Sequence, residues 1–188
     1  IIIAGAKLKH IIVSFILLFS SFFLLILAAP YRMKRLLTFL DPYEDPHGAG
    51  YQIIQSFVSF ANGKFFGVGL GNSSQKLFFL PQGHNDFIFS IIAEELGFIG
   101  CMLTILLFLI LFYSILKMLK RSKDLFCKYL IGSILIITVT QVVINISVSI
   151  GLMPTKGVPL PLISYGGSSL VFTLGSLGLI YGLDKKRK

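Results

Sequence analysis

The chain is organised around four long apolar stretches, separated by segments that contain most of its polar and charged residues. The stretches cover approximately residues 11–29, 87–116, 129–152 and 165–183. A transmembrane helix needs about 20 consecutive apolar residues to cross the roughly 30 Å hydrocarbon core of a bilayer. The pattern therefore predicts an all-α polytopic membrane protein, with a single membrane domain over residues 1–188 and four transmembrane helices.

The second stretch, residues 87–116, is the longest and contains two acidic residues near its start. As one helix it would measure about 45 Å, which exceeds the hydrocarbon thickness. Glu94 and Glu95 are costly inside a bilayer unless they face protein or water. Either the first turns of this helix protrude from the membrane, or the two carboxylates face a cavity lined by protein.

Basic residues mark one side of the membrane. They cluster at residues 7–10 before the first stretch, at 117–128 between the second and third, and at 184–188 after the fourth. Loops rich in Lys and Arg are retained in the cytoplasm. We therefore expect both ends of the chain to be cytoplasmic, with one large external loop at 30–86 and a short one at 153–164.

The composition supports a membrane protein and excludes several other classes. The chain is 55% hydrophobic and 13% charged, whereas soluble domains carry about 25% charged residues. A soluble enzyme, a disordered chain and a disulfide scaffold are therefore excluded. The net charge of +9 suits cytoplasmic loops that face anionic lipid, so we expect no nucleic-acid partner. Cys101 and Cys127 form no CxxC pair and no metal-binding set.

The large external loop contains a further helical pattern. Residues 51–61 place Ile54, Phe57, Val58 and Ala61 at helical spacing. This spacing predicts a short helix at the membrane interface or re-entering the protein, with polar residues such as Gln52 on its other side. Simple packing against the helical bundle and a role in substrate binding are equally consistent with the pattern.

The strongest candidate for chemistry is Asp86, at the entrance of the longest apolar stretch. By residue type alone it caps the first turn of that helix. The alternative is an ionised carboxylate at the membrane surface that acts as a general base or holds a divalent cation. The spacing of Asp86, His84, Glu94 and Glu95 does not match a zinc site.

Other polar residues of the external loops are candidates for binding an anion. Arg32, Lys34 and Arg35 follow the first stretch, where they attract either lipid headgroups or an anionic lipid-linked substrate. The segment 67–72 forms either a run of turns or a backbone nest for a diphosphate. The Pro-rich loop 153–164 presents three polar residues outward, the last of them as an N-cap for the following helix; they are Thr155, Lys156 and Ser164.

Several long sequence motifs, which follow one another along the chain, resemble those of a single protein family. They are GYQIIQS, GVGLGNSSQKLFFLP, HNDFIF, AEELGF and GLMPTKGVPLPLISYGGSS. The chain is identified by them as a member of the SEDS family of bacterial cell-wall synthesis proteins, FtsW, RodA and SpoVE. The family has about ten spans, so the resemblance implies that these are the last four, in agreement with a start that lacks Met. Most of these motifs are closer to the division branch of the family, and GVPLP is closer to the elongation branch.

The resemblance implies a function and a site. Family members polymerise lipid II into glycan strands at the outer face of the bacterial cytoplasmic membrane, during division at the septum, with a class B penicillin-binding protein and other divisome proteins. Their essential aspartate falls on Asp86, which would deprotonate the acceptor hydroxyl directly or through a bound Mg²⁺ or Mn²⁺ ion. The residues implied for substrate binding come from both external loops: Lys76, Lys156, Arg32, Arg35, Gln52, His84, Thr155 and Ser164.

Two other functions fit the same features. A lipid II flippase also needs a groove and external basic residues, but it should tolerate replacement of Asp86. A divisome scaffold that only docks a partner would require neither Asp86 nor Lys156. Asp86 is therefore the residue that separates the three functions.

Overall fold

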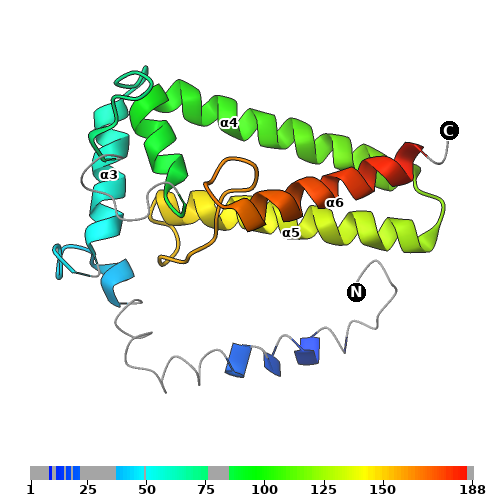
Figure 1. Ribbon diagram of the computed structural model, residues 1–188. Helices are drawn as coiled ribbons and strands as arrows, with labels where there is room; N and C mark the ends of the chain where they lie inside the picture. Colours follow the sequence, from blue (N-terminus) through cyan, green and yellow to red (C-terminus); the bar gives the residue numbers. More distant parts are fainter. Residues whose placement is uncertain are drawn as a thin grey trace.

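The computed structural model describes residues 9, 12–14, 16–17, 19–21, 37–48, 50–75 and 85–185. Within these residues the fold is helical and contains no strand. Four helices organise it: α3 (Tyr51–Gly63), α4 (Ile88–Arg121), α5 (Leu125–Ser149) and α6 (Gly167–Lys185). Figure 1 shows α4, α5 and α6 running side by side, with α3 standing across one end of them.

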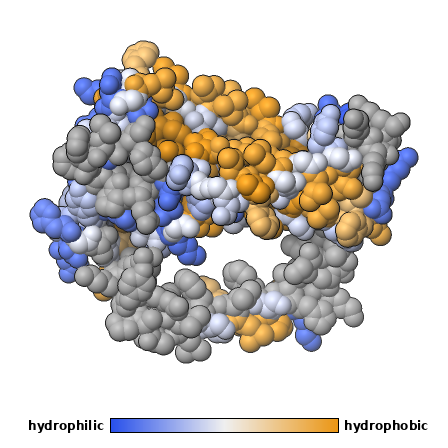
Figure 2. All heavy atoms as spheres, viewed as in Figure 1, coloured by the Kyte–Doolittle hydropathy of each residue, from blue (hydrophilic) through white to orange (hydrophobic). Residues whose placement is uncertain are grey.

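Helices α4 and α5 form an antiparallel pair joined by a short turn (Figure 1). The Asp124 carboxylate accepts a hydrogen bond from the Cys127 amide at 3.1 Å and so caps the start of α5. Both helices are long and apolar enough to cross a membrane. Their exposed faces are largely hydrophobic, as Figure 2 shows along the bundle. An apolar surface of this extent requires lipid or further protein around it.

The described helices agree closely with three of the predicted apolar stretches. The stretches at 87–116, 129–152 and 165–183 correspond to α4, α5 and α6. The apolar part of α6, Gly167–Leu183, is shorter than the other two candidates. In the first predicted stretch the described residues, 12–14, 16–17 and 19–21, are helical with exposed side chains. The number of spans and their orientation stay predictions.

Helix α4 is broken at Gly97, which the sequence pattern did not predict. Gly97 has φ 67° and ψ −162°, a backbone conformation that other residues rarely adopt. The residues before the break, 88–96, cross the end of the bundle and pack on α3, while the residues after it, 98–121, continue as the long apolar helix. The straight part measures about 36 Å, which suits one membrane crossing with some tilt.

A turn after α3 supplies the hydrogen bonds that the break removes from α4. The Phe98 amide donates to the Lys64 carbonyl at 2.9 Å, and the Ile99 amide donates to the Phe65 carbonyl at 3.3 Å. In return, the Val68 and Gly69 amides donate to the carbonyls of Glu94 and Glu95, at 2.9 and 3.0 Å. Backbone groups exposed by a helix break need such partners, above all at membrane depth.

Helix α3 is present as predicted, but it buries its small polar side chains rather than its apolar stripe. Ser56 and Ser59 are fully buried, whereas Val58 and Ala61 are exposed. The Ser56 hydroxyl donates to the Ser149 carbonyl at 2.6 Å and lies 2.5 Å from the Ser90 hydroxyl, which donates to it. Small residues let helices approach closely, so α3 packs directly on α4 and α5, and the ring of Phe57 lies against Gly151. Packing against the bundle is therefore present in the structure, and a role of α3 in substrate binding stays a prediction.

Candidate functional site

Asp86 lies at the point where α4 begins, one residue before the N-cap Phe87. Phe87 is almost completely buried against Val148 of α5, which fixes the chain at this point. The start of α4 has no side-chain cap, so the capping role that residue type alone suggests for Asp86 is not what the structure contains. Within the described residues the Asp86 carboxylate accepts no hydrogen bond. Partial burial raises the pKa of this carboxyl above its ordinary value.

Asn145 of α5 fixes the backbone at Asp86. Its side-chain amide donates to the Asp86 carbonyl at 2.9 Å and to the Val158 carbonyl at 2.8 Å. Asn145 is only 1% exposed, and its Oδ1 has no hydrogen-bond partner in the described part of the chain. One buried amide therefore connects three separate segments: the start of α4, the C-terminal part of α5 and the loop 153–164.

Ser164 makes a second connection, between the loop 153–164 and the residues just before α4. Its hydroxyl donates to the Asn85 carbonyl at 2.6 Å and accepts from the Leu160 amide at 2.7 Å. The prediction that Ser164 points outward and caps the last helix is wrong, because Ser164 is buried and α6 begins at Gly167. The hydroxyl is instead used to close the loop on itself and to hold it against Asn85.

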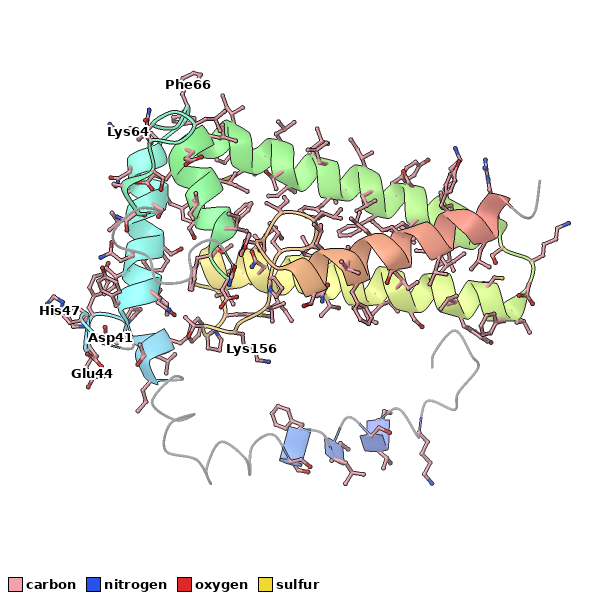
Figure 3. All side chains as sticks on the ribbon, viewed as in Figure 1. Asp41, Glu44, His47, Lys64, Phe66 and Lys156 are labelled. Carbon is pink, nitrogen blue, oxygen red and sulfur yellow. The ribbon has the colours of Figure 1, made fainter. Side chains whose placement is uncertain are left out.

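The short loop brings its own backbone next to the carboxylate. A Cβ placed on Gly157 would lie 3.4 Å from Asp86 Oδ2, so this glycine faces the carboxylate directly. Its neighbour Lys156 is exposed, and Thr155 is half-buried. Figure 3 shows Lys156 extending from this loop on the side that faces away from Lys64 and Phe66. The structure thus brings the loop containing Lys156 to Asp86, as the predicted site requires.

The remaining predicted site residues are placed elsewhere or fall outside the described residues. Gln52 is half-buried in the first turn of α3, and none of the described contacts joins it to Asp86. The four basic candidates of the large loop lie outside the described residues: Arg32, Arg35, Lys76 and His84.

Glu94 is the centre of a polar cluster that the sequence located but did not explain. Its buried carboxylate accepts hydrogen bonds from the Ser73 hydroxyl, the Ser74 hydroxyl at 3.0 Å, the Gln75 amide at 3.3 Å and the Asn62 side chain at 3.4 Å. Such donors offset the cost of burying a carboxylate. Glu94 therefore faces protein, and it anchors the loop that follows α3.

The glycine-rich segment 67–72 is a run of turns rather than an open diphosphate nest. Its amides at Gly67, Val68, Gly69 and Asn72 all donate to backbone carbonyls. A nest needs consecutive free amides that point to one centre. The Val68 and Gly69 amides hold the turn against α4, and the Gly67 and Asn72 amides close turns within the segment and onto the end of α3.

A divalent cation at Asp86 is compatible with the chemistry of the site. The described residues contain no cluster of three His, Cys, Asp or Glu side chains that could hold a metal alone. Mg²⁺ needs less, because it is commonly bound by one or two carboxylates together with waters and substrate phosphates. Asp86 is a half-buried carboxylate that accepts no hydrogen bond from the residues that the structure describes, which suits that role.

A groove lies between α5 and α6, next to the short loop. Its volume is about 550 Å³, and Pro159 of the short loop contributes to its lining. Its walls combine apolar side chains with hydroxyls and one amide: Ile134, Ile137, Thr138, Gln141, Ser168, Ser169, Phe172, Thr173 and Ser176. The sequence suggests that the function needs a groove but does not place it, because a groove depends on how two helices pair.

The fold and site together define a helical membrane protein with a half-buried carboxylate, Asp86, at the start of its longest apolar helix. The model of the FtsW, RodA and SpoVE family, described as cell cycle proteins, matches residues 1–188. The chain belongs to this family.

Individual relatives support the same assignment. The chain is 43% identical to "Stage V sporulation protein E" of Bacillus subtilis (strain 168), over 98% of this chain and 50% of that protein. It is 45% identical to "Probable peptidoglycan glycosyltransferase FtsW" of Idiomarina loihiensis, over 99% of this chain and 46% of that protein. The chain thus spans about half the length of the curated relatives that it matches.

A solved structure shares the fold. It is described as "Structural coordination of polymerization and crosslinking by a peptidoglycan synthase complex". The similarity has a TM-score of 0.70 at 31% identity, and it covers 96% of this chain and 50% of the other.

Proposed function

We propose that this chain forms the catalytic part of a peptidoglycan glycosyltransferase that polymerises lipid II. The observation that carries the proposal is the position of Asp86, a carboxylate with no protein donor in the described residues. It is fixed through its backbone by Asn145 and, through the adjacent carbonyl of Asn85, by Ser164. The names of the relatives, which include probable peptidoglycan glycosyltransferases, support the same activity.

The reaction needs a base more than a strong acid. The acceptor sugar hydroxyl forms a bond to the anomeric carbon of the donor, and the bond from that carbon to the prenyl diphosphate breaks. The diphosphate is already a good leaving group, so the proton of the acceptor hydroxyl is the one that must be removed. Asp86 accepts it, and its raised pKa makes the carboxylate a better base than an ordinary aspartate.

The negative charge of the leaving diphosphate needs a cation. Lys156 is the described candidate, because it adjoins the glycine that faces Asp86. Arg32, Arg35, Lys76 and His84 are further candidates in the large loop. A divalent cation held by Asp86 would supply the same stabilisation of charge when it is bound.

We place the reaction at the outer face of the bacterial cytoplasmic membrane, at the division septum. The two predicted external loops contain Asp86 and Lys156. The description of the solved structure, which couples polymerisation to crosslinking, supports a class B penicillin-binding protein as the partner.

The test is glycan-strand formation from purified lipid II by the full-length protein with its penicillin-binding partner. Asp86→Asn keeps the size of the side chain and removes the base, so polymer formation should fall roughly 10²–10⁴-fold. Glu44→Gln is the matched control, because Glu44 is an exposed carboxylate of the same loop that Figure 3 places at the far end of α3 from Lys64.

Each outcome separates the candidate functions. Loss of polymer in Asp86→Asn alone, with complex formation intact, supports the polymerase. Equal polymer from both variants would overturn the assignment of Asp86. If the wild-type protein makes no polymer but moves lipid II across vesicles, and Asp86→Asn does too, the flippase is the correct function.

A further inference from the structure

The turn that follows α3 exposes several large apolar side chains. Phe65, Phe66 and Leu70 are 68%, 82% and 74% exposed, and the neighbouring Val68 is 41% exposed. Figure 3 shows Phe66 projecting from the end of α3, away from the rest of the protein, with Lys64 beside it. Apolar side chains gathered on one exposed turn mark an interaction surface.

The depth of this turn along the bundle is fixed by backbone hydrogen bonds. The carbonyls of Lys64 and Phe65 accept from the first two amides of the straight part of α4, those of Phe98 and Ile99. The rings of Phe65 and Phe98 also meet edge to face, with their centroids 6.1 Å apart. The turn is therefore held at the level where the membrane-crossing part of α4 begins.

The turn also continues the apolar outer face of that helix. The side chains just beyond the break are exposed and apolar, among them Phe98, Ile99, Met102 and Leu103. Figure 2 shows this hydrophobic surface along α4 and up to its end beside the turn. A surface that continues the exposed apolar face of a helix long enough to cross a membrane, and lies at the end of that helix, has the position of the aromatic belts of membrane proteins.

The charge around the turn suits the headgroup region. Between Asp45 and Asp86 the sequence contains no acidic residue, and its two charged residues are Lys64 and Lys76. Lys64 is exposed at the start of the turn. A lysine beside exposed aromatic rings favours phosphate headgroups above an acyl boundary.

We propose that Lys64–Leu70 is a membrane anchor, in which Phe66 and Leu70 insert among the acyl chains just below the headgroups. Lys64 then lies at the level of the lipid phosphates. The anchor holds the break at Gly97 in the plane of the interface, together with α3, which lies across the end of the bundle.

The chain contains no Trp, so a single introduced Trp is an unambiguous fluorescent reporter once any Trp of the full-length protein outside this chain has been replaced by Phe. Phe66→Trp and Leu70→Trp report on the anchor at two exposed positions, where the new ring disturbs no packing. Leu109→Trp, exposed at the middle of the straight part of α4, is the deep reference. Tyr43→Trp, exposed in the acidic turn that precedes α3, is the aqueous reference.

The measurement is quenching in vesicles whose lipids carry bromine either near the headgroup end or near the middle of the acyl chain. Both anchor reporters should lose roughly half of their emission to the shallow bromine and less to the deep one, as for side chains at the interface. Leu109→Trp should show the opposite order. If both anchor reporters behave like Tyr43→Trp, or if neither lipid quenches them because protein covers the turn, the proposal is overturned.

Discussion

At the scale of single residues, the arrangement of the site depends on Asn145. Its amide satisfies two buried carbonyls that belong to different segments, those of Asp86 and Val158. Asn145→Ala leaves both carbonyls without a donor, which should cost roughly 2–4 kcal/mol of stability. It should also let Asp86 move, and a displacement of about 1 Å can lower turnover roughly 10²-fold.

The measurement that separates positioning from stability is steady-state polymerisation, below the melting temperature of the variant. We expect kcat to fall much more than KM rises, because Asn145 holds the base and does not face the substrate. Thr140→Ala is the control: Thr140 is exposed on the same helix and does not line the groove, so its kcat should stay near the wild-type value. Equal losses in the two variants would exclude a specific role for Asn145.

The pKa of Asp86 gives a pH dependence with a definite sign. Burial raises this pKa, so the carboxylate is protonated, and inactive as a base, up to a higher pH than an ordinary aspartate. Activity should therefore fall on acidification at a pH above the usual aspartate range. Because a raised carboxyl pKa means that ionisation opposes folding, stability should decrease as pH rises through that range and stay lower above it. Thermal melts at neutral pH should then show Asp86→Asn at least as stable as the wild type.

At the scale of the helices, the break in α4 is the feature on which the rest depends. An alanine at Gly97 would have to adopt φ 67°, and its Cβ would lie 2.5 Å from the Gly67 amide nitrogen. Gly97→Ala should therefore destabilise the protein by roughly 1–3 kcal/mol or straighten the helix. Gly178→Ala is the matched control, because nothing lies within 4 Å of its Cβ position in α6, and there alanine should be neutral or stabilising by about 1 kcal/mol.

Thermal denaturation of the two glycine variants in detergent measures this difference directly. A Gly97→Ala variant as stable as Gly178→Ala would show that the break is not required. The comparison keeps the chemical change constant and varies only the backbone conformation and the space around the residue.

The sequence predicted the helices well because apolar runs of this length leave few alternatives. Within the described helices the pattern missed the break of α4 at Gly97. This break is stabilised by contacts with residues that lie about 30 positions earlier in the chain, which a local pattern does not reveal. Gly97 looks like any small residue of a membrane helix, whereas the carbonyls that replace its hydrogen bonds come from Lys64 and Phe65. For the same reason, periodicity identified α3 but not its buried face, since Ser56 is buried by pairing with Ser90 and Ser149.

The sequence was sufficient to predict the central residue of the candidate site, Asp86. It was not sufficient to predict the residues that fix the backbone around it, Asn145 and Ser164. Asp86 is recognisable as an acid at the mouth of an apolar helix and by its place in the family motif. Asn145 was visible only as a polar residue in an apolar stretch, because its two acceptors lie in segments that meet only in the folded protein. Ser164 was assigned to the wrong partner, since a hydroxyl before a helix resembles an N-cap until the true start of the helix is known.

At the scale of the whole molecule, charge separates the two ends of the bundle. The turn between α4 and α5 is flanked by basic residues, among them Lys120, Arg121 and Lys123. The acidic turn that contains Asp41 and Glu44 lies at the opposite end, near the start of α3 (Figure 3). The straight part of α4 between them measures about 36 Å, enough to place the two ends on opposite sides of a membrane.

The positive-inside rule then predicts that the turn between α4 and α5 is cytoplasmic and that the turn before α3 is external. With Cys101 and Cys127 replaced by Ser, the variants Lys123→Cys and Tyr43→Cys each place one exposed thiol at one end. A membrane-impermeant thiol reagent should label Tyr43→Cys in intact cells whose outer layers admit it, and Lys123→Cys only after the membrane is permeabilised. The reverse labelling pattern would place Asp86 on the cytoplasmic side of the membrane, where the lipid-linked disaccharide has not yet been exported. Both the predicted orientation and the external location of the site would then be wrong.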